Sequence, residues 1–130
     1  MADNFISVTP FASAARSADA NSDDILNKGF RGLIVFFNVS VAAGDDTMTL
    51  TIQGKDAVSG EYYTLLTGGA LSTTGLRVYE IHPEAAAASG GVTAVANRIL
   101  PETWRAQLDY TQVGEVKTAI TCSVSAVHVR

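Results

Sequence analysis

Carboxylates are the residues of this sequence whose chemistry could support catalysis or cation binding. The acidic residues that fall mostly at predicted turns are Asp45, Asp46, Asp56, Glu61 and Glu102. A glycosidase needs two carboxyl groups held at a fixed separation across a cleft, whereas carboxylates at turns mostly bond to the nearby backbone. The segment AGDDT, residues 43–47, lacks the spaced oxygen ligands of a dedicated calcium loop. The sequence therefore predicts no catalytic acid–base pair and no metal site.

Nucleophilic chemistry has equally little support. The single cysteine, Cys122, lies in the alternating run TAITCSVSAVHV, where we expect a buried, small apolar side chain. A catalytic thiol needs a nearby base, and neither His82 nor His128 has a local setting that suggests such a pair. The glycine-containing run TGGALSTTG lacks the lysine and the strand-to-helix context of a phosphate-binding loop. We therefore expect that the protein is not an enzyme and that it binds no cofactor.

The stretch TIQGKDAVSGEYYTLL, residues 51–66, predicts a β-hairpin with polar groups gathered at its turn. Asp56, Ser59 and Gly60 suit a tight turn, and Lys55 and Glu61 flank it across the strand pair. We interpret GKDAVSG as a hairpin tip that closes the strands. If the tip has a further role, that role is contact with a neighbouring protein.

Exposed tyrosines could add to such a contact. Tyr62 and Tyr63 are consecutive in an expected strand, so one of them must point outward. Tyr79 is expected on the outward face of a later strand. Exposed tyrosines suit protein interfaces and the stacking of sugar rings. The candidate protein-interface residues are therefore Phe5, Phe11, Lys55, Asp56, Glu61, Tyr62 and Tyr79.

Composition excludes several classes of partner. The net charge is −4 and no two basic residues are adjacent, so the clustered positive charge of a nucleic-acid or anionic-membrane surface is missing. The longest apolar run, residues 33–37, is far shorter than the ~20 residues of a membrane helix. The N-terminus does not resemble a signal peptide. We expect a protein that is made in the cytosol and stays or assembles there.

The chain is expected to form one domain preceded by an arm. Residues 1–29 are polar and alanine-rich, and Phe5 and Phe11 are among their few large apolar groups. Such a segment buries little by itself, so we expect an extended arm that pairs with the body or with a neighbouring chain. Residues 30–130 are then the folded domain.

The pattern of that domain is β throughout. Residues 33–37 are continuously apolar, typical of a strand buried on both faces. Residues 47–55 alternate threonine with apolar side chains, and residues 103–112 alternate with Trp104 facing inward. Pro83 and the following alanines suggest a loop with at most one helical turn, and the run ILPE at 99–102 suggests a crossing between sheets. The sequence predicts an all-β, antiparallel β-sandwich, jelly-roll or Ig-like, of about six to eight strands, with a small barrel as the alternative.

Several of these motifs occur together in one known family. The pattern L-x-I-x-G-K-D at 50–56, the SG turn, YYTLL at 62–66 and ANRILPETWR at 96–105 resemble small virion structural proteins of tailed bacteriophages, over roughly residues 33–127. The resemblance implies a non-enzymatic protein that decorates or cements the capsid by bridging capsomers. It also implies a virion location after synthesis in the host cytoplasm, with the major capsid protein as partner. Capsid symmetry favours a homotrimer, and a tail or neck location is also compatible.

A second class of function stays open at this point. The strand–turn–strand pattern is similar to the hairpin of discoidin-like and other carbohydrate-binding sandwiches, although their usual disulfide and loop aromatics are absent. A carbohydrate-binding or receptor-binding module would need Tyr62 or Tyr79 exposed in a groove. A glycosidase is a distant third because no paired acids are evident.

Overall fold

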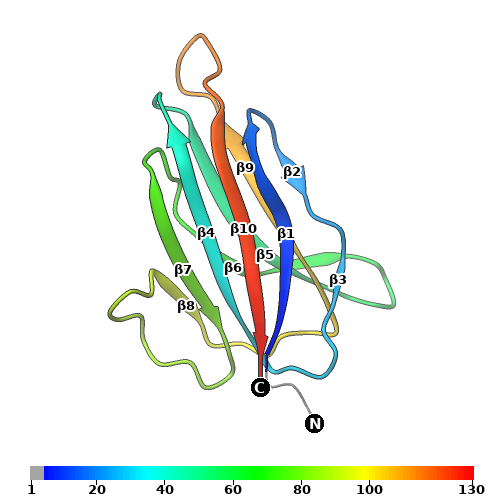
Figure 1. The fold of residues 1–130 in the computed structure, drawn as a ribbon. Coiled ribbons are helices and arrows are strands. Elements are labelled where there is room, and N and C mark those ends of the chain that lie inside the picture. The colour runs from blue at the N-terminus through cyan, green and yellow to red at the C-terminus, as the bar shows by residue number, and fades with distance from the viewer. Residues whose placement is uncertain (1–4) are drawn as a thin grey trace.

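The computed structural model describes residues 5–130 as two β-sheets packed face to face (Figure 1). No helix occurs in this part of the chain. The strands are β1 (Phe5–Arg16), β2 (Ala20–Asn21), β3 (Ile25–Leu26), β4 (Gly32–Ala42), β5 (Thr47–Lys55), β6 (Tyr62–Thr67), β7 (Gly75–Ile81), β8 (Ala94–Ala96), β9 (Thr103–Thr111) and β10 (Ile120–Val129). The predicted all-β sandwich is confirmed.

The strand order is that of a jelly roll. One sheet has the order β1-β10-β4-β7-β8, and the other has the order β2-β9-β5-β6, with β3 also pairing with β9. When the short strands β3 and β8 are set aside, the first strand lies beside the last, and the second beside the next to last. This is the double Greek-key arrangement of a jelly roll. All pairs are antiparallel except β7–β8, which is parallel.

The N-terminal segment is part of the sandwich. It is extended, as expected for an arm, but β1 pairs with β10, and β2 and β3 pair with β9. Of the two expected partners, residues 5–29 therefore use the body of their own chain. Phe11 lies opposite Val124 and is buried in the core, so its assignment to an exposed interface was wrong. The side chain of Phe5 lies outside the described part of the structure.

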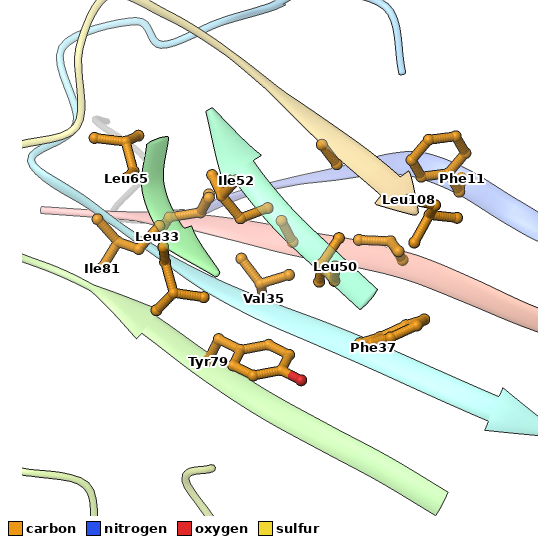
Figure 2. Packing of buried hydrophobic residues seen from close by; sticks show 14 of the residues in the cluster. Phe11, Leu33, Val35, Phe37, Leu50, Ile52, Leu65, Tyr79, Ile81 and Leu108 are labelled. Atoms are coloured by element: carbon orange, nitrogen blue, oxygen red, sulfur yellow. The ribbon is translucent and has the colours of Figure 1, made fainter. Parts of the chain in front are cut away.

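The core lies between the sheets and follows the alternation of the strands. Figure 2 shows side chains of β4, β5, β6, β7 and β9 meeting there. The largest fully buried side chains include Trp104, Tyr79, Phe37, Leu33, Met48, Leu50, Ile52, Ile81 and Leu108. Burial of Trp104 and Cys122 was predicted and is confirmed. The expectation that the 33–37 run is buried on both faces was wrong, because Ile34 and Phe36 are only half-buried on the outer face.

Tyr79 lies inside the sandwich rather than on its surface. Its register partner across β4 is Val35, whose side chain faces the core, so Tyr79 must face the core too. Its hydroxyl is buried and has no hydrogen-bond partner among residues 5–130, and burial raises the pKa of Tyr79. The predicted outward orientation was wrong because β7 carries apolar side chains on both faces, which left its alternation ambiguous.

Two connections between strands have the form predicted from the sequence. Residues 82–93 contain no helix. The segment 99–102 crosses from one sheet to the other, and Leu100 is buried while its N–H donates to the carbonyl of Arg31 at 3.2 Å. The predicted crossing is therefore confirmed.

One polar interaction ties the two sheets together inside the core. Trp104 of β9 donates its indole N–H to Nε2 of His128 of β10 at 2.9 Å. Since Nε2 accepts this bond, the ring proton of neutral His128 must lie on Nδ1, which is 3.3 Å from the carbonyl oxygen of Ile6 in β1. Phe30 packs against the His128 ring at 5.7 Å between centroids. The Trp104–His128 hydrogen bond thus links the two sheets, and the other nitrogen of His128 faces the edge strand β1.

This arrangement predicts a stability that depends on the charge of His128. Burial holds the pKa of His128 below its ordinary value of 6.5. The unfolded chain therefore takes up a proton at this site before the folded protein does, and the free energy of unfolding should fall as the pH drops below about 6.5. Urea unfolding at pH 7.5 and pH 5.0 measures the effect.

Matched variants separate His128 from other titrating groups. His128→Gln should lower the free energy of unfolding at pH 7.5 by about 1–3 kcal/mol, the cost of disturbing the hydrogen bond of the buried Trp104 indole N–H. It should also reduce the difference in the free energy of unfolding between pH 7.5 and pH 5.0. His82→Gln should keep that difference. A His128→Gln variant with the wild-type pH dependence would contradict the assignment.

Candidate functional site

The connection between β5 and β6 projects from the sandwich, past β3, on the right-hand side of Figure 1. Lys55 and Tyr62 are the last paired residues of the hairpin. Beyond them, the N–H of Asp56 donates to the carbonyl of Glu61 at 2.8 Å, and the N–H of Gly60 donates to the carbonyl of Asp56 at 2.8 Å. We call residues 56–61 the hairpin tip.

The Asp56 side chain closes the tip. One carboxylate oxygen accepts the backbone N–H of Val58 at 3.0 Å, and the other accepts the Ser59 hydroxyl at 2.8 Å. These bonds lower the pKa of Asp56, with the Val58 N–H as the largest cause. Gly60 has a φ of 78°, the left-handed region that favours glycine. The predicted turn roles of Asp56, Ser59 and Gly60 are confirmed, and Val58 is left 97% exposed.

The root of the hairpin is held by Asp24, which lies between β2 and β3. One oxygen of Asp24 accepts from Nζ of Lys55 at 2.7 Å, and the other accepts from the Tyr62 hydroxyl at 2.6 Å. The bond from Lys55, followed by that from Tyr62, lowers the pKa of Asp24, and Asp24 raises the pKa of Lys55. Lys55 and Tyr62 are thus engaged within the chain.

The aromatic ring of Tyr62 is also engaged. The Arg105 guanidinium lies 3.5 Å from the centre of the Tyr62 ring, and its Nε donates to Gln53 at 2.8 Å. We call Gln53, Lys55, Tyr62 and Arg105 with Asp24 the bracket. Arg105 and Gln53 could have been found as outward residues of two alternating strands. Asp24 could not, because it is 31 residues from Lys55.

The candidate interface residues are therefore divided. Lys55, Asp56, Glu61 and Tyr62 come together on the hairpin, whereas Tyr79 and Phe11 are buried elsewhere. Of the two consecutive tyrosines, Tyr63 is the more exposed. Its ring lies against Gly54, where an added Cβ would come within 2.6 Å of it.

A second loop projects at the opposite end of the sandwich. β5 and β9 pair from Thr47 with Thr111 to Gly54 with Trp104, so the loop that follows β9 and the hairpin tip lie at opposite ends of the pair. This loop, residues 112–119, is at the top of Figure 1. Its apolar side chains Val113 and Val116 are 60% and 77% exposed.

Asp46 braces this second loop from beneath. Its carboxylate accepts from the Tyr110 hydroxyl, from the N–H of Val113 at 2.9 Å and from the N–H of Thr118 at 2.8 Å. The Tyr110 hydroxyl and then these two backbone bonds lower the pKa of Asp46 to about 2. The sequence identified Asp46 only as a turn residue, and its role depends on a loop far along the chain.

Comparisons with protein-family models, curated proteins and solved structures found no match. Among residues 5–130 there is no helix long and apolar enough to cross a membrane. The same residues contain no group of three or more His, Cys, Asp or Glu side chains placed to hold a metal ion.

The bracket predicts that Asp24 controls the local stability of the hairpin. Asp24→Asn removes the charge that holds Lys55, so the amide protons of residues 55–62 should exchange severalfold faster while global unfolding changes little. Hydrogen exchange followed by NMR measures this. Asp23→Asn is the matched control, because the adjacent Asp23 side chain makes no hydrogen bond or ion pair among the described residues. Equal exchange rates in the two variants would contradict the bracket.

Proposed function

We propose that this protein is a non-enzymatic structural protein of a bacteriophage virion that decorates or cements the capsid by bridging capsomers. Two lines support the proposal. The motifs at 50–66 and 96–105 resemble small virion proteins of tailed phages. The jelly roll is also a fold of viral capsid domains, although a fold alone does not define a function.

The observation that carries the proposal is the pair of braced loops. A bridging protein needs two separate contact surfaces that hold their positions. The hairpin tip and the 112–119 loop lie at opposite ends of β5, a strand of nine residues, which at about 3.3 Å per residue spans about 30 Å. Each loop presents exposed valine and is held by a carboxylate. Preorganised loops lose less conformational entropy when they bind.

The surface area is sufficient for more than one contact. A standard interface covers roughly 800 Å² of each partner, and the chain exposes 6836 Å². We propose that the 112–119 loop faces the major capsid protein and that the protein acts as a homotrimer, since closed cyclic symmetry matches the local three-fold axes of a capsid. Three linked contacts would strengthen the hold on the shell by avidity.

The carbohydrate-binding alternative has lost the residues on which it depended. Tyr79 is buried, and one ring face of Tyr62 is covered by Arg105. A neck or tail location uses the same bridging geometry and stays an alternative within the same class.

Binding to phage shells that lack the protein tests the proposal. Purified protein should sediment with such shells and raise the temperature at which they open. Val116→Asp puts a charge on the 112–119 loop and should weaken binding at least tenfold, because a carboxylate in an apolar contact must be desolvated. Ile99→Asp, at the opposite end and 69% exposed, is the control and should bind normally. Protein that stays in the supernatant at all concentrations contradicts the capsid role.

A further inference from the structure

We propose that the hairpin tip of one copy docks into the groove between β1 and β3 of a second copy. This contact joins the subunits head to tail and closes them into a ring. It supplies the subunit interface of the trimer, and it rests on the proposed function only for the number of subunits.

The groove lies on the open side of the sandwich, between the edge strand β1 of one sheet and β3 of the other. Its volume is about 360 Å³, and it is lined mainly by apolar side chains. Phe30 and His128 are buried at its base, while Ile6 and Leu26 stand at its rim and Leu26 is 54% exposed. The apolar lining residues are Ile6, Val8, Ile25, Leu26 and Phe30.

The charges of groove and tip are complementary. At the groove, Asp24 is committed to Lys55 and Tyr62, which leaves Lys28 as the exposed cation among the lining residues. Arg130 adds positive charge beside it, 5.5 Å from the Phe30 ring.

At the tip the balance is reversed. The Val58 side chain is almost fully exposed, and the acidic residues Asp56 and Glu61 belong to the same tip. At the root of the hairpin, Lys55 is paired with Asp24 and Arg105 lies over the Tyr62 ring. The tip is thus an apolar side chain with acidic neighbours. The groove is an apolar site with the exposed cations Lys28 and Arg130, and its lining carboxylate, Asp24, is paired with Lys55. Opposite charges around an apolar contact fix its partner and orientation.

The bracket explains why the occupant comes from another copy. Asp24 lies beside the groove and holds the root of its own hairpin, which continues outward past β3 (Figure 1). The tip of the same chain cannot turn back into the groove while the bracket is intact. Because tip and groove are different surfaces, the contact between copies is head to tail, and such contacts close into rings when the rotation permits.

Strand addition along β1 is a weaker way to use this side of the molecule. β1 is an edge strand, but it contains Pro10 and has register shifts between Val8 and Phe11 and between Phe11 and Ala14. Proline and bulges interrupt the regular ladder that a further strand needs. A side chain entering the groove does not need that ladder.

Complementary variants test the contact by light scattering coupled to size exclusion. In Val58→Asp the tip can no longer dock but the groove is unchanged. In Leu26→Asp the groove can no longer accept a tip but the tip is unchanged. Wild type should be a trimer, and each variant alone a monomer. An equal mixture of the two should give dimers, because one functional tip meets one functional groove and no further contact is possible. Val116→Asp should stay trimeric.

Each other result overturns the contact. These results are a monomeric wild type, a trimer of folded Val58→Asp or Leu26→Asp, or a mixture that stays monomeric. Circular dichroism checks that the variants fold, and Val58→Ser, which keeps the turn bonds of Asp56, repeats the test without added charge. Shell binding separates this inference from the proposed function. Binding by wild type with a persistent Val58→Asp trimer overturns only the contact, and a ring that ignores shells overturns only the capsid role.

Discussion

The hydrogen bond from Trp104 to His128 is the constraint on which the hairpin end of this jelly roll depends. Trp104 pairs with Gly54 on β5 and with Ile25 on β3, and His128 pairs with Ile6 on β1. The indole and imidazole rings therefore lie in the core next to the root of the hairpin and next to the groove beside β3. A buried indole N–H needs an acceptor, and neutral His128 supplies one while its other nitrogen faces the backbone of β1. The groove and the hairpin root therefore both pack against the Trp104–His128 pair.

Carboxylates in this protein serve as structural acceptors. Asp56 closes the hairpin tip, Asp24 holds the hairpin root, and Asp46 braces the 112–119 loop. Each accepts at least two hydrogen bonds, which explains the lowered pKa of all three. These bonds hold the two projecting loops in place and leave valine side chains exposed on both.

The sequence predicted those features that depend on one strand or one turn. The alternation of residues 47–55 set Met48, Leu50 and Ile52 on the face opposite the threonines, and that of residues 103–112 placed Trp104 inward. The spacing of Asp56, Ser59 and Gly60 identified the tip. Tyr79 was placed wrongly because β7 is apolar on both faces. The polar composition of the first residues concealed that they add strands to both sheets. A polar strand at a sheet edge is stabilised by its pairing and buries few side chains.

Features that depend on pairing between distant strands could not be predicted from the sequence. The bracket requires Asp24 to meet Lys55 and Arg105, and the core bond requires Trp104 to face His128. The bracket follows from the order of strands, which brings β3, β5 and β9 together, and the core bond follows from the packing of the two sheets, which places β9 against β10. Local patterns did not decide between a jelly roll and an Ig-like sandwich, so these neighbours were not known.

We propose that two braced loops join this protein to its neighbours in a virion. A cryo-electron microscopy reconstruction of the assembled particle tests it most directly. We expect jelly-roll density around local three-fold axes of the shell, with the 112–119 loop against the capsid protein and each hairpin tip enclosed by the next copy. Density in which both loops face solvent, or a particle without this protein, would contradict it.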